Sequence, residues 1–282
     1  MTSARPSIAD KRRTFHTLHE AGCFVIPNPW DVGSALYLQS IGFKALASTS
    51  SGLAWSQGYA DNKVTRDAVL EHLAALVAAT DVPVNADFEG GFAHEPAGVA
   101  ESVRLAVETG VAGLSIEDST SDPAKPLYDL DLAVARMRAA RQAIDAAGGD
   151  TLLVGRAECF LVGRPDRAET IARLQAYADA GADCLYAPGL KTREEIAEVV
   201  AAVAPKPFNV LIGFPSELSV QDAASLGVRR ISVGGALARS AWGGFMRAAR
   251  AILDDGRFGV FAEAASGKDL NALFATRAKD SR

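Results

Sequence analysis

Short apolar runs alternate with longer amphipathic stretches along nearly the whole chain. Apolar runs of this length, bounded by glycine, are typical of buried strands, whereas apolar residues at three- and four-residue spacing are typical of helices. The alternation predicts eight strands, at residues 24–27, 45–49, 82–87, 113–118, 152–158, 184–187, 207–212 and 230–233. The predicted helices between and after them include residues 65–80, 96–110, 131–148, 167–181, 192–203 and 236–256.

Several predicted helices end at a glycine that directly precedes or approaches the next apolar run. Gly110, Gly148, Gly181 and Gly227 stand at such boundaries, where a glycine readily terminates a helix. Eight strand–helix units predict an α/β fold, a (β/α)8 TIM barrel, with a doubly wound parallel sheet as the alternative. No Pro/Ser-rich or single-charge linker interrupts the pattern, which indicates one domain over residues 1–282.

The C-terminal residues 257–282 form a helical arm beyond the predicted barrel. Its apolar face is built on Leu270, Leu273 and Phe274. A surplus amphipathic helix must bury its apolar face somewhere, and a second subunit is one place. The arm therefore favours a homo-oligomer.

Composition narrows the class of protein. The chain has 282 residues, of which 49% are hydrophobic, and a formal net charge of −5, which gives no electrostatic reason to expect nucleic acid or a membrane as partner. The three cysteines are too scattered for a disulfide framework or a zinc site. Residues 1–22 are polar and helical in pattern, and no apolar run is long enough to span a membrane. We expect a soluble, cytoplasmic protein.

Carboxylates follow three neighbouring predicted strands. Asp61 lies in the loop after the second strand, Asp87 and Glu89 follow the third, and Glu117 and Asp118 end the fourth. These loops meet at the carboxyl-terminal face of a barrel, so the carboxylates can converge. Convergent oxygen ligands favour Mg²⁺ or Mn²⁺. The alternative is that each residue caps a helix or pairs with a rim cation.

The fifth strand supplies Arg156, whose inward burial requires an anionic partner. The guanidinium fork suits a substrate carboxylate, with Glu158 orienting it; the alternative is an internal ion pair with Glu158 or Glu117. In the segment Ser50-Ser51-Gly52-Leu53, small residues would let backbone N–H groups approach an anion, although the same string describes ordinary turns.

Order and spacing of these motifs resemble the isocitrate lyase and phosphoenolpyruvate mutase superfamily. The resemblance is carried by PNPWDVGSALYLQSIGFKALASTSSGLA, NADFEGGF, IED, VGRAE and LGVRRISVGG. It implies a Mg²⁺-dependent (β/α)8 enzyme, usually a dimer or tetramer with an exchanged C-terminal helix. Such an enzyme forms or breaks a bond beside an enolpyruvate-like or 2-oxo acid intermediate.

By position, the resemblance also implies roles for single residues. Ser51, Gly52 and Leu53 match a stretch whose backbone amides hold the oxo acid, and Asp61 matches an acid that supports the metal through water. In the strands, Asp87 matches the second Asp of the family's Asp-x-Asp metal motif, and Glu117 matches the strand-four acid of the metal shell. Arg156 matches the arginine that binds the substrate carboxylate.

The chain departs from the family pattern at several positions. Asn85 replaces the first Asp of the metal motif, which removes a carboxylate ligand unless Glu89 takes its place. The loop after the fourth strand lacks the cysteine of isocitrate and methylisocitrate lyases. Thr49 replaces an aromatic residue of the mutases, and Lys125 is only a loose match to their lid lysine. These differences disfavour both the isocitrate and methylisocitrate lyases and the mutases.

What remains is a Mg²⁺-dependent lyase that cleaves a carbon–carbon bond of a small, oxaloacetate-like 2-oxo acid through a pyruvate enolate. Tyr128, Tyr186 and His94 are candidate proton donors. Asn209 points inward on the seventh strand, as a pocket residue or as a polar filler of the barrel. The alternatives are a phosphorus–carbon bond enzyme, acting as phosphoenolpyruvate mutase or phosphonopyruvate hydrolase does, and a barrel that binds a 2-oxo acid without turnover.

Overall fold

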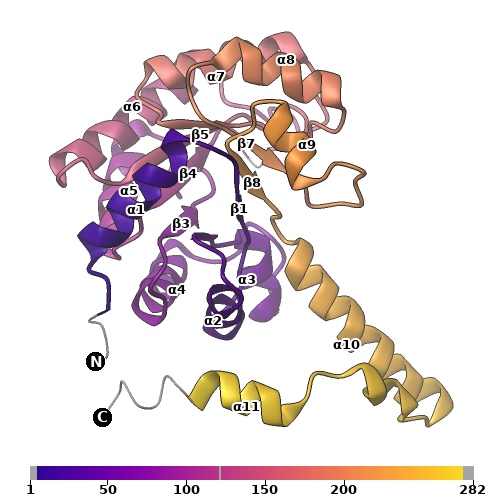
Figure 1. Ribbon diagram of the computed structural model, residues 1–282. Coiled ribbons are helices and arrows are strands. Elements are labelled where there is room, and N and C mark those ends of the chain that lie inside the picture. The colour runs from indigo at the N-terminus through magenta and orange to yellow at the C-terminus, as the bar shows by residue number, and fades with distance from the viewer. Residues whose placement is uncertain (1–4, 121, 276–282) are drawn as a thin grey trace.

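Eight parallel strands form a nearly closed barrel in the computed structural model, which describes residues 5–120 and 122–275 (Figure 1). The strand order β1-β8-β7-β6-β5-β4-β3-β2 places each strand beside its neighbour in sequence, and the Ala47 N–H group donates across the remaining gap to the Pro27 carbonyl at 3.0 Å. This confirms the (β/α)8 barrel and excludes the doubly wound sheet. The strands are β1 (Phe24–Ile26), β2 (Leu46–Ala47), β3 (Val84–Asp87), β4 (Gly113–Glu117), β5 (Leu152–Arg156), β6 (Cys184–Tyr186), β7 (Phe208–Leu211) and β8 (Arg230–Ser232).

Helices surround the barrel and cover its amino-terminal end. Most begin at a Ser, Thr or Asp whose side chain accepts a hydrogen bond from the first turn, as Thr65 and Thr192 do. The helices are α1 (Ile8–Glu20), α2 (Val32–Ser40), α3 (Ser50–Ser56), α4 (Arg66–Ala79), α5 (Pro96–Glu108), α6 (Leu130–Ala146), α7 (Arg167–Asp179), α8 (Arg193–Val203), α9 (Val220–Ser225), α10 (Ala236–Asp255), the 3₁₀ segment η1 (Gly259–Glu263) and α11 (Gly267–Ala275).

Alternation along the strands separates the helix-facing core from the barrel interior. In β4, Leu114 and Ile116 belong to the main hydrophobic core, whereas Ser115 and Glu117 line cavities at the barrel mouth. Within the described residues, no helix is both long enough and apolar enough to cross a lipid bilayer.

Helix α1 closes the amino-terminal end of the barrel. Phe15 is fully buried in a cluster with Ile26, Ala45 and Leu152. Lys11 donates to the carbonyls of Val77 and Thr80, so the helix is fixed to the α4–β3 turn. The opposite, carboxyl-terminal end remains available for a site.

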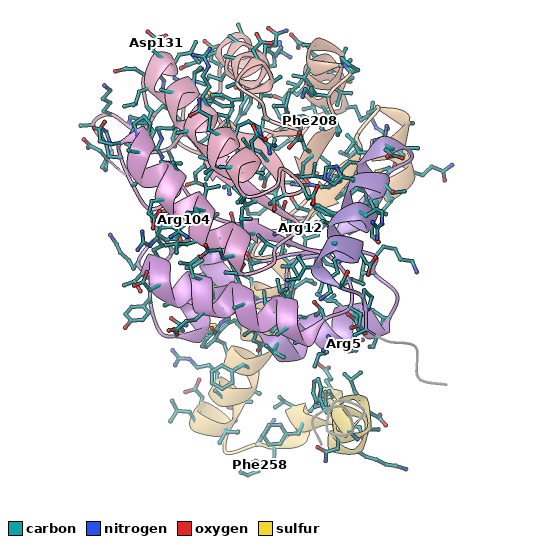
Figure 2. The ribbon with its side chains drawn as sticks, turned by 90° about the vertical axis from the view of Figure 1, so that its left-hand side faces the viewer. Arg5, Arg12, Arg104, Asp131, Phe208 and Phe258 are labelled. Carbon is teal, nitrogen blue, oxygen red and sulfur yellow. The ribbon has the colours of Figure 1, made fainter. Side chains whose placement is uncertain are left out.

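The C-terminal arm extends beyond the barrel and contacts it again at α11. Helix α10 leads away from β8, and Figures 1 and 2 show η1 and α11 lying beyond the barrel wall. Helix α11 returns to α2 of the same chain, where Phe274 lies close to Gly33. The exchange of this arm between subunits stays a prediction, and residues 276–282 of the arm, like residues 1–4 of the predicted N-terminal helix, lie outside the described residues.

Candidate active site

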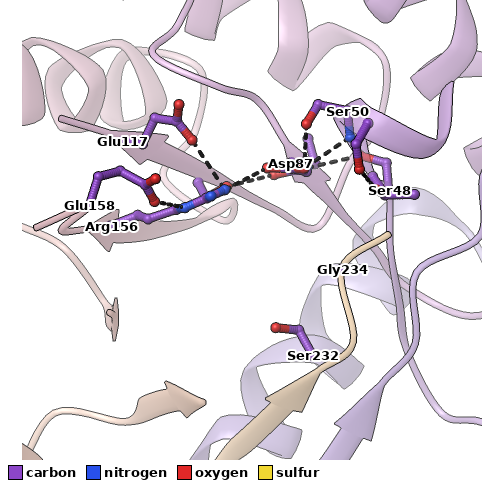
Figure 3. Close-up of polar contacts among 12 residues, drawn as sticks. Ser48, Ser50, Asp87, Glu117, Arg156, Glu158, Ser232 and Gly234 are labelled. Carbon is purple, nitrogen blue, oxygen red and sulfur yellow. Dashed lines mark hydrogen bonds and ion pairs between the residues drawn. The ribbon is translucent and has the colours of Figure 1, made fainter. Parts of the chain in front are cut away.

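Arg156 joins three carboxylates at the carboxyl ends of neighbouring strands (Figure 3). Its Nη1 atom lies 3.1 Å from Asp87 Oδ1 and 3.1 Å from Glu117 Oε2, and its Nε donates to Glu158. The strands β3, β4 and β5 pair in register, which brings these side chains together. The sequence predicted that these charged residues lie together. The ion pairs of Arg156 with Glu158 and Glu117 are those expected as the alternative to a contact between Arg156 and a substrate carboxylate.

Burial and charge act in opposite directions on Arg156. Burial alone would lower the pKa of the guanidinium, but the charges of Glu158 and Glu117 raise that pKa well above its ordinary value. Burial also raises the pKa of Glu117, which Arg156 lowers and Asp87 raises again. The arginine is therefore a permanent cation among carboxylates that compete for it.

Glu89 adds a further carboxylate. Burial and the charges of Asp87, Glu117 and Asp61 raise the pKa of Glu89 to about 8. Burial and the charge of Asp87 also raise the pKa of Asp61. Five carboxylates, counting Glu158, thus share one region in which Arg156 is the shared counter-charge, and this excess of negative charge suits a divalent cation.

In this conformation Arg156 lies between the carboxylates that we expect to bind metal. Accordingly, no three His, Cys, Asp or Glu side chains of the described residues converge as metal ligands do. Asp87, Glu89 and Glu117 are the residues that would hold such a metal. The donor set has the right chemistry, since all its members are hard oxygen ligands.

Asn85 lies one strand layer deeper than Asp87. Its side chain donates to the Ala86 carbonyl and accepts from Arg230 at 3.3 Å, inside the barrel. Glu89 lines a cavity together with Glu117. The roles of Asn85, Asp87, Glu89 and Glu117 as metal ligands stay predictions.

Helix α3 begins where a loop was expected after β2. Thr49 caps it, accepting from the Gly52 N–H group at 3.3 Å, and the Leu53 N–H group donates to the Thr49 carbonyl. The Ser50 N–H and hydroxyl groups both bind Asp87, at 2.9 and 3.0 Å. The amides of Gly52 and Leu53 are thus used inside the helix, and the Leu53 side chain is buried in the core.

Ser50 and Ser51 line the pocket. The turn after β8 closes on them, because a Cβ atom on Gly235 would lie 2.7 Å from Ser51 Oγ. A side chain at this position would have to displace the Ser51 hydroxyl and press on Trp55, so the serine face of α3 and the β8 turn form one wall of the pocket.

The predicted pocket residue Asn209 is fully buried and does not line the described cavities. It donates to Ser232 Oγ at 2.9 Å and accepts from Arg230 at 2.8 Å. Its inward direction was predicted from strand parity, but its depth was not. This arrangement agrees with the alternative, a polar residue that fills the barrel.

The proton-donor candidates separate into two places. Tyr186 lines the inner cavity, and the Arg156 guanidinium lies 5.1 Å from its ring centre. His94 and Tyr128 line a neighbouring cavity beside Glu89 and contact each other at 3.3 Å. Lys125 pairs with Asp129 on the exposed loop.

Open space adjoins the charged cluster on both sides. An outer cavity of about 630 Å³ contains Asp61, Glu117, Arg156 and Glu158. An inner cavity of about 320 Å³ reaches into the barrel and contains Asp87 and Arg156. Such volumes accommodate a small organic acid.

Backbone strain gathers at the same site. Asn62, Glu89 and Phe92 adopt positive φ angles of 59°, 48° and 55°. Non-glycine residues in this region are held there by their surroundings, commonly at functional sites. The turn in FEGGF thus presents Glu89 toward Asp87.

Several site residues were not predicted from the sequence. Ser119 donates to Glu117 at 2.8 Å, Ser48 accepts from the Asp87 N–H group, and Ser115 and Ser232 line the inner cavity. Single serines carry no sequence signal beyond inward strand parity. Asp118, in contrast, turns outward to Tyr177 and Arg173, because adjacent strand residues face opposite sides.

The fold and site together define an α/β-barrel enzyme with an arginine–carboxylate centre at the carboxyl ends of its strands. Residues 15–253 match the family model for phosphoenolpyruvate phosphomutase, and the chain belongs to this family, within the isocitrate lyase and phosphoenolpyruvate mutase superfamily.

Relatives agree with this assignment. A solved structure from Burkholderia cenocepacia J2315, provisionally described as a lyase or mutase, superposes with a TM-score of 0.93 at 49% identity, covering 95% of this chain and 97% of that one. An uncharacterised Mycobacterium tuberculosis protein is 36% identical over 86% of this chain and 89% of its own. Oxaloacetate decarboxylase of Bradyrhizobium diazoefficiens is 32% identical over 56% of this chain and 54% of its own.

Proposed function

We propose that the protein is a divalent-metal-dependent lyase that cleaves a carbon–carbon bond of a small, oxaloacetate-like 2-oxo acid through a pyruvate enolate. The observation that carries the proposal is the cluster of Asp61, Asp87, Glu89 and Glu117 around Arg156. The relative that decarboxylates oxaloacetate supports the substrate class.

Asp87, Glu89 and Glu117 would hold Mg²⁺ or Mn²⁺, with Asp61 supporting it from the neighbouring loop. The ion would supply Lewis-acid stabilisation of negative charge on the oxo oxygen. Asn85 has no part in this site, because its side-chain oxygen is directed toward Arg230.

Arg156 would bind a substrate carboxylate with its remaining donor edge. Its Nε and Nη1 atoms contact carboxylates, and no hydrogen bond to Nη2 is seen among the described residues. Glu158 fixes the plane of the guanidinium, so the fork is oriented before substrate arrives. Ser50 and Ser51 close the opposite wall.

Tyr186 is the proton donor that we favour, because it shares the inner cavity with Arg156. Burial raises its pKa to about 12, which Arg156 partly opposes, so the hydroxyl keeps its proton at neutral pH. His94 and Tyr128 open onto the other side of Glu117.

Calorimetric titration of the metal-stripped protein with oxalate, a stable mimic of the pyruvate enolate, tests the proposal. Oxalate should bind in the presence of Mg²⁺ and should not bind to Asp87→Asn. The matched control is Asp122→Asn, since Asp122 lines the same outer cavity but hydrogen-bonds only within its own loop. Failure of oxalate to bind in either condition would remove the proposal.

Turnover separates the two alternatives. Release of pyruvate from oxaloacetate identifies the lyase, whereas turnover of phosphonopyruvate would identify a phosphorus–carbon bond enzyme. Oxalate binding without turnover of either compound would identify a binding barrel.

We also infer that the protein forms a homodimer or homotetramer in the cytoplasm. Helix α10 buries only Ala238 in the single chain, and Phe245 and Leu253 are 62% and 77% exposed. A second copy of the chain is the partner that the family resemblance implies.

A further inference from the structure

Arg230 opens strand β8 and points into the barrel, where 3% of its surface is exposed. Its Nε donates to Asn209 at 2.8 Å, and its Nη1 donates to Asn85 at 3.3 Å and lies 3.5 Å from His19. The side chain thus reaches across the barrel from β8 toward β3, below the carboxylate cluster.

The charge of Arg230 is not met by a carboxylate. None of the ion pairs formed by the described residues includes it, whereas Arg156 and Arg173 each contact at least two carboxylates. The buried Arg136, which also forms no ion pair with any of these residues, instead donates to three backbone carbonyls. Burial and the neighbouring Arg230 charge lower the pKa of His19 to about 3, so this histidine is neutral. A buried, unpaired cation is costly, and an anion that reaches it recovers that cost.

A path to Arg230 exists through the inner cavity of about 320 Å³, which it lines together with Arg156, Ser115, Tyr186 and Ser232. Among the described residues no hydrogen bond to its Nη2 atom is seen, while Nε and Nη1 are held by amides. The floor of the cavity therefore offers a guanidinium with a free edge.

We propose that Arg230 binds the second carboxylate of the substrate and selects 2-oxo dicarboxylic acids over monocarboxylic ones. The inference rests on the proposed function, in which Arg156 and the metal hold the end of the substrate that reacts. Two cations at different depths of one cavity suit a molecule with an anionic group at each end.

The side chains that hold Arg230, those of Asn85 and Asn209, carry no charge, and the proposed site depends on this. Asn85 and Asn209 orient the guanidinium through their amide oxygens without cancelling its charge. An aspartate in either position would form an internal ion pair and remove the driving force for binding an external carboxylate. Asn85 is therefore a specificity residue acting through Arg230, which accounts for an amide in place of the family's aspartate.

The test compares malate with 2-hydroxybutyrate, stable 2-hydroxy acids that differ by a carboxylate in place of a methyl group, in calorimetric titrations with Mg²⁺. The wild-type protein should bind malate about tenfold or more tightly, the range expected for hydrogen bonds to a charged group. Asn85→Asp should lose this preference while remaining at least as heat-stable, because the new carboxylate pairs with Arg230. Gln175→Glu, which adds a carboxylate on α7 outside this cavity, is the matched control and should keep the preference.

Oxalate distinguishes the two proposals. Equal affinity for malate and 2-hydroxybutyrate, alongside Mg²⁺-dependent oxalate binding, would overturn the role of Arg230 and leave the lyase standing. An Asn85→Asp protein that gains Mg²⁺ affinity and keeps the malate preference would also overturn it.

A second measurement does not depend on 2-oxo acid chemistry. Formate should raise the melting temperature of the wild-type protein and of the control Gln175→Glu more than that of Asn85→Asp. Equal shifts in all three would show that formate does not bind at Arg230 and would contradict the inference, whatever oxalate does.

Discussion

Arg156 and Arg230 are buried at two depths of the barrel, and their surroundings differ in charge. Arg156 has carboxylate partners from three strands, whereas Arg230 has neutral amides. The first arrangement fixes a cation in place, and the second leaves one to be paired from outside. Stability and binding should therefore respond differently to changes at the two residues.

Replacing Arg156 with alanine should abolish oxalate binding and lower the free energy of unfolding at pH 7 by about 3–5 kcal/mol, because three carboxylates lose their buried counter-charge. Urea denaturation measures the loss, which should shrink as pH falls and the carboxylates protonate. Arg173→Ala, which breaks the ion pairs with Asp118 and Glu169 outside the pocket, should be destabilised yet still bind oxalate. Retention of binding by Arg156→Ala would rule out its role.

Glu89 should make the metal-free protein less stable as pH rises. Its folded pKa of about 8 exceeds the ordinary value of 4.5, so between these values the native state holds more protons than the unfolded state. The stabilising proton is fully present below pH 4.5 and is lost as pH passes through 8. Glu89→Gln should reduce this slope in urea unfolding measured in EDTA and leave the part due to Glu158, whose pKa burial also raises to about 8, whereas the exposed Glu95→Gln should keep the full slope. Identical slopes in wild type and Glu89→Gln would contradict the assignment.

Strand parity predicted which residues point inward, but it could not give their depth. Asn85 and Asn209 were predicted at the site and lie a layer below it, held by Arg230. The position of Glu89 follows from a left-handed turn in FEGGF, which local sequence does not specify because Glu89 and Phe92 adopt positive φ angles only through their surroundings. The charged group of Asp87, Glu117, Arg156 and Glu158 was predicted, since it follows from adjacent strand ends.

At the scale of elements, the apolar pattern predicted all eight strands to within two residues at each end. Strands form where runs of apolar residues can be buried, and such runs can be read directly from the sequence. Helix α3 was missed because its start, Ser50-Ser51-Gly52, has the composition of a turn; the cap at Thr49 is the signal that identifies it.

Asn28, in the turn after β1, connects three strand ends. It donates to the Ser48 carbonyl and accepts from the N–H groups of Val233 and Gly234, each at 2.9 Å. Asn28→Ala leaves these groups unpaired and should lower the free energy of unfolding by roughly 1–3 kcal/mol, measured by urea denaturation. Asn28→Asp keeps the acceptor and should lose less. Equal losses in both variants would show that the acceptor contributes nothing.

For the whole molecule, the apolar surface of α10 is the feature that one chain leaves uncovered. Sedimentation velocity should show an oligomer, and Phe245→Asp combined with Leu253→Asp should yield monomers because both side chains are exposed in the single chain. Val220→Asp alters an exposed apolar residue on α9 and should leave the oligomer intact. A monomeric wild-type protein at micromolar concentration would contradict the assembly.

The closure of the barrel between β1 and β2 depends on far fewer bonds than the β4–β5 pairing, which extends over five residue pairs. Local opening of a fold begins where few hydrogen bonds must break, so this seam should be the first part of the wall to exchange its amide hydrogens. The inner cavity is lined by Ala47 of β2, on one side of the seam. On the other side it is lined by Arg230 and Ser232 of β8, the strand that pairs with β1. A dicarboxylate bound between Arg156 and Arg230 would lie beside this seam, and the amide of Ala47 would report its arrival by slower hydrogen exchange.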